Sequence, residues 1–196
     1  MATSSVSICS NALLMVGAQT INSLDGDLSD RQRLAVNLYP TVRDYVLTMH
    51  PWNCCIARVV LNPDTVGPVF DYANAFTIPA DFLRMLSIGE QGAELDYRIE
   101  NGKLLCDSSP IQLRYIYRNT TEANWTPMLV MAMTQAMRQV LAYPITQSTS
   151  LEQLIDQTLE PILRRARAVD SQDQPPETLG DFRLLSSRYS GIGITG

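Results

Sequence analysis

Apolar residues recur at helical spacing in four segments of the chain, and a stretch of different period separates the first two from the last two. The helical segments are residues 4–17, 29–49, 126–143 and 150–170. Between the two pairs, apolar and polar residues alternate, which is typical of half-buried strands. The predicted strands are residues 54–61, 82–88, 95–100, 103–107 and 111–118. This pattern predicts an α+β protein.

Local signals mark the ends of the predicted helices. Ser29 with Gln32 forms a capping box at the start of the second helix, and Ser150 can cap the last one. Pro40 removes a backbone donor inside the second helix and is predicted to kink it. Pro51 restricts the residue before it to extended backbone, so this helix is expected to end there.

The same periodicity predicts which helical residues face the core. In the second helix the predicted apolar face consists of Leu34, Leu38, Val42, Tyr45 and Val46. In the last helix it consists of Leu151, Leu154, Ile155, Leu159, Ile162, Ala166 and Val169. The four Met residues of the third helix are predicted to lie in the core, and an adaptable partner contact remains the alternative: Met128, Met131, Met133 and Met137.

The strand segment contains one strong turn signal, and the order of the elements predicts the domain organisation. Asn101-Gly102 is a dipeptide favoured in type I′ turns, so the strands around it are predicted to form a hairpin. We predict an antiparallel helical bundle with an inserted small antiparallel β-domain and an extended C-terminal arm. The predicted boundaries are residues 1–53 and 122–170 for the bundle, 54–121 for the β-domain and 171–196 for the arm.

Charge and composition narrow the function classes. The chain of 196 residues carries a net charge of −5, which argues against a dedicated DNA-binding protein, because phosphate contacts require clustered cations. Lys103 is the single Lys among 15 basic residues; this Arg bias fits an interface-rich protein or a genomic base-composition effect. No signal peptide or membrane-spanning run is seen, so we expect synthesis in the cytoplasm and reduced thiols.

Residues with catalytic or metal-binding chemistry are few. His50 is the only histidine, and on this count we expect neither a catalytic triad nor a multi-histidine metal site. Cys54 and Cys55 are adjacent in a predicted strand, where they would point to opposite faces and could not share an ion; one buried and one partly exposed thiol is expected. Cys9 and Cys106 are predicted core residues.

Two charged clusters have structural explanations from the sequence alone. The acidic residues Asp25, Asp27 and Asp30 resemble a calcium loop, but the glycine position and distal glutamate of an EF-hand are missing. Turn formation and favourable charge at a helix N-terminus account for them. A basic cluster near the end of the last helix is predicted to be solvated, and a subunit contact is its alternative: Arg164, Arg165 and Arg167.

The order of short motifs along the chain resembles the phage head-to-tail adaptor proteins, including the tail tubular protein A group of short-tailed phages. The resemblance extends from the N-terminus to about residue 170 and is carried by the order of the motifs, because each is weak by itself. The motifs are residues 8–14, 16–18, 23–27, 38–44, 50–53, 76–84, 111–116 and 141–146. In the helical part they include Tyr39, Pro40, Arg43, Asp44, Pro51 and Trp52.

This resemblance implies a structural virion protein of the phage tail, assembled in the host cytoplasm. It implies a homo-oligomeric ring, usually of twelve subunits, that joins the portal protein to the tail nozzle and lets DNA pass during genome ejection without binding it specifically. It implies no enzymatic activity and no cofactor. From the residues themselves we expect no metal site and no membrane contact.

We assign expected contacts within this scheme from the residues. Asn101 and Gly102 at the hairpin tip are expected to meet the nozzle protein or tail fibres. The C-terminal arm is expected to bind the portal through Phe182, Arg183, Leu184, Leu185, Arg188 and Tyr189. Two other readings stay open: another virion connector, such as a head-completion stopper or tail-tube protein, and a cysteine hydrolase using Cys54 or Cys55 with His50.

Overall fold

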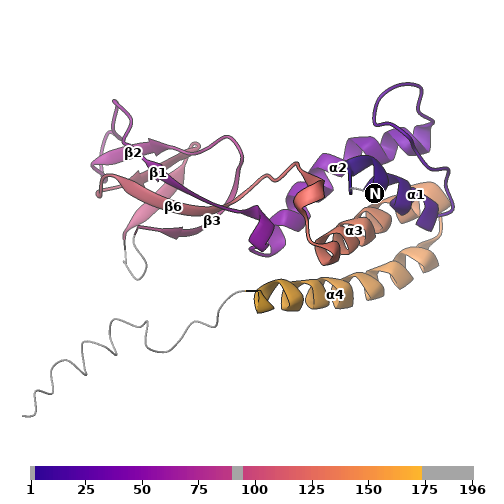
Figure 1. Ribbon diagram of the computed structural model, residues 1–196. Helices are drawn as coiled ribbons and strands as arrows, with labels where there is room; N and C mark the ends of the chain where they lie inside the picture. The colour runs from indigo at the N-terminus through magenta and orange to yellow at the C-terminus, as the bar shows by residue number, and fades with distance from the viewer. Residues whose placement is uncertain (1–2, 90–94, 174–196) are drawn as a thin grey trace, which may run out of the picture. The chain divides into compact units, whose positions relative to one another are not determined.

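The chain folds into a mixed α+β structure with four helices and two small antiparallel sheets in the part that is described (Figure 1). The computed structural model describes residues 3–89 and 95–173. The helices are α1 (Ser5–Met15), α2 (Asp30–Met49), α3 (Pro127–Thr146) and α4 (Thr149–Gln172), with short 3-10 helices at Asn53–Cys55 and Glu122–Asn124. The strands are β1 (Ile56–Leu61), β2 (Asn74–Thr77), β3 (Phe82–Ile88), β4 (Tyr97–Glu100), β5 (Lys103–Cys106) and β6 (Ile111–Tyr117).

Two compact units divide the described residues. One contains the residues up to Ala57 together with Asp81–Arg84 and Ile116–Gln172, and therefore holds all four helices. The other contains Arg58–Ala80 and Met85–Tyr115. Each unit has buried residues of its own.

The helical unit is organised around α3, which contacts α1, α2 and α4. Leu129, Met133, Met137 and Leu141 of α3 are fully buried, at the four-residue spacing that keeps side chains on one helix face. Burial of this kind contributes roughly 1.5–3 kcal/mol per large apolar side chain. The prediction of a core role is therefore confirmed for Met133 and Met137, whereas Met131 is 53% exposed.

The second unit has its own apolar cluster between short strands. β5 pairs with both β2 and β4, and the second sheet has the order β1-β6-β3. The fully or largely buried residues of this cluster are Phe76, Ile88, Leu104, Cys106 and Ile111. The predicted Asn-Gly hairpin is confirmed, because Glu100 faces Lys103 across a turn in which Asn101 and Gly102 both have positive φ.

Several local predictions differ from the structure. Residues 53–55 form a 3-10 turn, so the predicted strand begins only at Ile56. Strand β2 was not predicted, because its four residues show no alternation and depend on pairing with β5. Ser148 rather than Ser150 caps α4, since its Oγ accepts a hydrogen bond from the Leu151 amide at 3.3 Å. Residues 171 and 172 belong to α4, so the predicted arm would begin later; residues 174–196 lie outside the described part.

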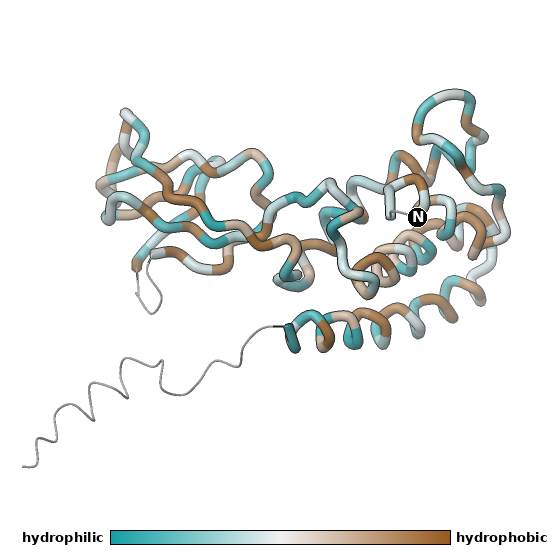
Figure 2. Tube along the Cα trace, viewed as in Figure 1, coloured by the Kyte–Doolittle hydropathy of each residue, from teal (hydrophilic) through white to brown (hydrophobic). Residues whose placement is uncertain are grey.

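The predicted helix faces are correct in direction but include exposed residues. In α2 the buried residues are Ala35, Tyr39, Val42, Val46 and Leu47, whereas Tyr45 is 59% exposed. In α4 it is Ile155, Leu159, Leu163 and Ala166, whereas Leu154 and Val169 are exposed. Figure 2 shows the resulting alternation of hydrophobic and hydrophilic residues along α4. A small error in the helical phase moves a boundary residue from the buried to the exposed side.

Candidate functional site

The end of α2 is built by the residues of the His50-Pro51-Trp52 motif. The last carbonyls of a helix have no partner within the helix and need donors from elsewhere. The Nε1–H of the fully buried Trp52 donates to the Val46 carbonyl at 3.0 Å, and Arg84 donates to the Thr48 carbonyl at 2.8 Å. Pro51 prevents continuation of the helix and places Trp52 to fold back onto it. The motif therefore acts as a C-terminal cap.

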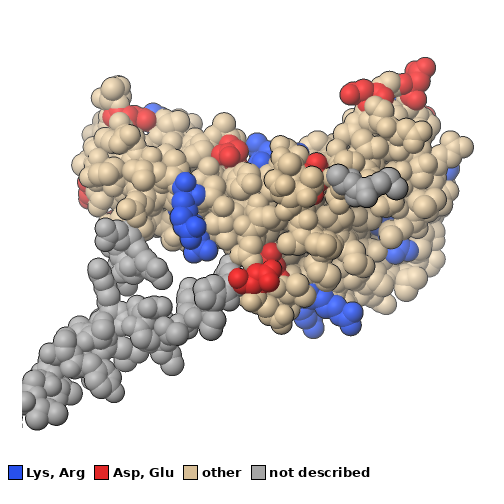
Figure 3. All heavy atoms as spheres, in the orientation of Figure 1, with Lys and Arg blue, Asp and Glu red and all other residues tan. Residues whose placement is uncertain are grey.

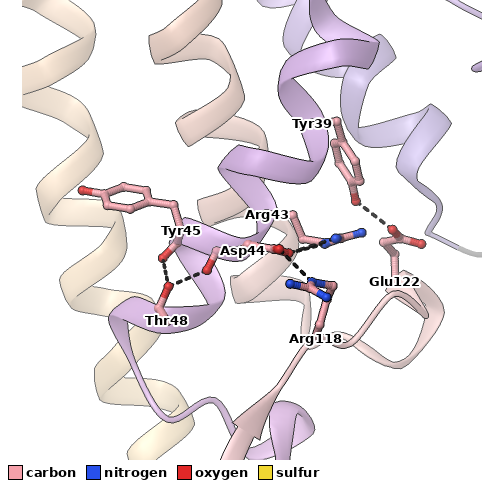
Figure 4. Close-up of polar contacts among 7 residues, drawn as sticks. All are labelled: Tyr39, Arg43, Asp44, Tyr45, Thr48, Arg118 and Glu122. Carbon is pink, nitrogen blue, oxygen red and sulfur yellow. Dashed lines mark hydrogen bonds and ion pairs between the residues drawn. The ribbon is translucent and has the colours of Figure 1, made fainter. Parts of the chain in front are cut away.

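Asp44 lies between two arginines one turn before this end (Figure 4). Its Oδ1 accepts from Arg43 Nε at 2.9 Å, and its Oδ2 accepts from Arg118 Nε at 2.7 Å. Arg118 follows β6, and its amide donates to the Asp81 carbonyl at 2.7 Å. The Asp44 carboxylate thus joins α2 to the end of a strand far away in sequence, with both of its oxygens used.

A second polar contact connects α2 to the segment before α3. The Tyr39 hydroxyl donates to Glu122 Oε1 at 2.8 Å, and the Tyr39 ring is buried (Figure 4). Burial, followed by the hydrogen bond to Glu122, raises the pKa of Tyr39 above its ordinary value. The hydroxyl is therefore a neutral donor at physiological pH, and its contact is structural.

Asp170 ties the last turn of α4 to the segment that follows α2. Its carboxylate is 2% exposed and accepts from the Asn53 amide, with Oδ2 3.1 Å away. The Asn53 side chain donates to the Asp170 carbonyl at 2.6 Å, and His50 Nε2 lies 3.4 Å from Asp170 Oδ2. Burial lowers the pKa of His50, although Asp170 acts in the opposite direction, so the neutral imidazole is favoured.

Cys54 and Cys55 follow directly and lie in the 3-10 turn. Their sulfur atoms are 3.7 Å apart, so the expectation that they point to opposite faces is wrong for a turn of this geometry. Cys55 is buried and Cys54 partly exposed, and Cys9 and Cys106 are buried, as predicted. The Cys54 carbonyl accepts from Asn119 Nδ2 at 2.7 Å and from the Tyr117 hydroxyl at 3.3 Å.

The residues predicted from motifs thus fall into three groups. Tyr39, Arg43, Asp44 and Trp52 form polar contacts on α2 or at its end, whereas Pro40 is exposed within a helix that continues through it. Asn101 and Gly102 are exposed in the β4–β5 turn of the other unit. The predicted arm residues lie outside the described part: Phe182, Arg183, Leu184, Leu185, Arg188 and Tyr189.

Sequence reasoning missed three partners in these contacts: Arg118, Glu122 and Asp170. Asp170 left a detectable signal, because it follows Ala166 by four residues and so continues the buried face of α4 with a carboxylate. A charge on an apolar face requires a partner when it is buried. Arg118 and Glu122 left no comparable signal: Arg118 ends a predicted strand and Glu122 lies in a short 3-10 helix, and neither pattern indicates a partner on α2.

The charged clusters singled out in the sequence are exposed. Asp25, Asp27 and Asp30 lie at or near the loop between α1 and α2, where Figure 3 shows acidic atoms gathered at the upper right. Arg164 and Arg165 are exposed on α4, and Arg167 lies 3.6 Å from Glu160. The described residues contain no group of three or more His, Cys, Asp or Glu side chains placed to hold a metal ion.

Comparison with known proteins identifies no relative of this chain: no family model and no curated protein matches it. Among the described helices, none combines the length and the hydropathy needed to cross a bilayer. The contacts at the end of α2 bring together charged and amide groups whose hydrogen bonds go to one another and to backbone carbonyls. This arrangement fixes the geometry of the chain segments that meet there.

Proposed function

We propose that this protein is a structural virion protein, a head-to-tail adaptor that forms a ring between the portal and the tail nozzle and lets DNA pass. The observation that carries the proposal is the ordered series of motifs along the chain. The helical motif residues Tyr39, Arg43, Asp44 and Trp52 each make a contact that joins α2 to another segment or ends it. Residues that make such structural contacts are expected to recur among proteins that share a fold, so their match to the adaptor motifs supports a shared fold.

The same proposal includes the finer architecture. The four helices form an antiparallel bundle, the segment between α2 and α3 is an inserted β-domain, and residues 174–196 form the arm that binds the portal. The motifs contribute fold-forming contacts instead of reactive groups, which supports a protein without enzymatic activity or cofactor. Exposed apolar side chains on the helical unit, such as Leu14 and Met15, suit contacts between ring subunits.

The experiment that tests the function uses the full-length protein and purified portal rings. Mixed at physiological salt, the two should co-sediment, and electron micrographs should show a second ring stacked on the portal. Removal of residues 174–196 should abolish attachment while circular dichroism stays that of a folded protein, because α4 ends at Gln172. Many weak arms on one ring act together through multivalency.

A matched control replaces the exposed Asn101-Gly102 turn with another type I′ dipeptide such as Asp-Gly, which keeps the hairpin. This variant should attach to portals as the parent does and should lose binding to nozzle or fibre proteins. Full-length protein that ignores portal rings, or a truncated chain that attaches normally, would contradict the proposal. A ring that binds tail-tube subunits and no portal would favour the tail-tube alternative.

A further inference from the structure

Two adjacent thiols lie within reach of each other at a fixed turn that the proposed function does not use. Cys54 Sγ and Cys55 Sγ are 3.7 Å apart, and the turn that holds them is anchored on both sides. The Cys55 amide donates to the Trp52 carbonyl at 2.8 Å, and the Asn53 amide donates to Asp170. Adjacent cysteines in an extended strand would keep their sulfurs apart, so this proximity is a consequence of the 3-10 turn.

We propose that Cys54 and Cys55 form a peroxide-reactive site, at which the two thiols are reversibly oxidised to a vicinal disulfide. Cys54 is partly exposed, so a small hydroperoxide can reach it, whereas Cys55 is buried directly beside it. The attacking thiol therefore belongs to the partly exposed residue and the resolving thiol to the buried one. Redox-sensitive cysteines commonly have this arrangement of an accessible thiol next to a resolving one.

The reaction balances with hydrogen peroxide as the oxidant. The Cys54 thiol first releases its proton, and the thiolate attacks one peroxide oxygen: an S–O bond forms and the O–O bond breaks. The departing hydroxide takes up the released proton to become water. The Cys55 sulfur then attacks the Cys54 sulfenic acid, an S–S bond forms, the S–O bond breaks, and a second water leaves with the Cys55 proton. Two thiols are oxidised by two electrons, and one peroxide is reduced to two waters.

The protonation of the two thiols supports this order of attack. The contact with Cys55 lowers the pKa of Cys54, which favours its thiolate, whereas the contact with Cys54 and then burial raise the pKa of Cys55. Burial also raises the pKa of Cys9 to about 12, which keeps that thiol protonated and unreactive. Cys9 and the buried Cys106 are therefore internal controls within the same chain.

The product is expected to be strained and easily reduced. Consecutive Cα atoms are about 3.8 Å apart, below the roughly 4.4–6.8 Å found across ordinary disulfides. The peptide between the two cysteines must therefore rotate. The Cys54 carbonyl would then lose its hydrogen bonds from Asn119 and Tyr117, which destabilises this part of the helical unit. Strained disulfides of this kind are readily reversed by dithiols.

Peptide mass spectrometry after peroxide treatment tests the proposal on the full-length protein. The tryptic peptide of residues 44–58 should lose two hydrogen atoms, while Cys9 and Cys106 remain open to alkylation after denaturation. Dithiothreitol should restore the original mass. In Cys55→Ser the Cys54 sulfenic acid should persist and react with dimedone. In Cys54→Ser, Cys55 should stay a thiol, at least about tenfold slower to oxidise.

Two results would overturn the proposal. One is equal oxidation of all four cysteines in the folded protein. The other is a Cys55→Ser variant that accumulates no dimedone adduct while the parent also keeps its full mass. As a second readout, the oxidised parent should unfold at lower urea than the reduced one, and Cys54→Ser should show no such difference after the same treatment. An oxidised parent of unchanged urea midpoint would contradict the predicted loss of the Cys54 carbonyl contacts.

Discussion

At the scale of single residues, a few side chains complete hydrogen bonds that the backbone leaves open. Trp52 and Arg84 satisfy carbonyls at the end of α2, and Asp44 balances two arginines at the same end. The contacts of Arg84 with Thr48 and of Arg118 with Asp44 join segments far apart in sequence, whereas Trp52 reaches back to Val46 six residues earlier. Loss of one partner leaves the other desolvated and unpaired, which makes these positions sensitive to substitution.

Replacement of Asp44 by Asn should lower the free energy of unfolding by about 1–2 kcal/mol, because two charge-assisted hydrogen bonds are weakened at a partly exposed site. Urea denaturation at neutral pH measures the change. Asp25→Asn is the matched control, since Asp25 is exposed in a loop, and its effect should stay within about 0.5 kcal/mol. Equal effects of the two substitutions would show that the Asp44 contacts contribute nothing.

The pH dependence of stability should report on His50. Burial lowers its pKa in the folded state, so the unfolded chain takes up a proton more readily as pH falls. The free energy of unfolding should therefore be highest above the ordinary histidine pKa and fall between about pH 7 and 5, by at most about 1.4 kcal/mol per pH unit for one proton. His50→Asn should flatten this slope. Because His50 is the only histidine, an unchanged slope would refute the assignment.

At the scale of elements, turns and helix ends are specified locally while pairing is not. The β4–β5 hairpin follows from Asn101 and Gly102, whose φ values of 48° and 71° suit a type I′ turn. The second neighbour of β5 is β2, which no local signal predicted. The turn therefore specifies the β4–β5 pair locally, whereas the β2–β5 pair depends on contacts between segments distant in sequence.

Substitution of Gly102 by Ala tests the turn without a steric complication. An added Cβ meets no atom within 4 Å, so the cost is that of a left-handed backbone, about 1–2 kcal/mol. Hydrogen exchange of the β4 and β5 amides should accelerate by a corresponding factor of roughly 5–30. The control Asn101→Gly keeps the turn and should leave exchange unchanged or slower. Unaltered exchange in Gly102→Ala would contradict the role given to this residue.

At the scale of the whole molecule, the charge balance sets what the chain attracts. A net charge of −5 and the absence of a basic run longer than Arg164-Arg165 disfavour strong binding to DNA. This property suits the proposed channel, where DNA must pass without adhering. The weak attraction for DNA follows from the charge of a single chain. In the proposed ring, many copies of that chain would present the same weakly attracting surface to the DNA.

The isolated protein should bind duplex DNA no more tightly than about 100 μM at roughly 150 mM salt, the weak end of non-specific binding. Fluorescence anisotropy with a labelled duplex measures this affinity. A titration at about 50 mM salt serves as the control, because any electrostatic contact would strengthen there. Saturable binding below about 1 μM at the higher salt would overturn the expectation.

The sequence alone determined the features that depend on neighbours along the chain. The end of α2 just before Pro51, the Asn101-Gly102 hairpin and the four helical segments follow from backbone restrictions and periodicity that act over a few residues. Only the tertiary structure decided which residues meet across long separations: Asp44 with Arg118, Asn53 with Asp170 and β2 with β5. The turn that brings Cys54 to Cys55 also depends on such anchors, because hydrogen bonds from distant segments select one local conformation among several that the sequence permits.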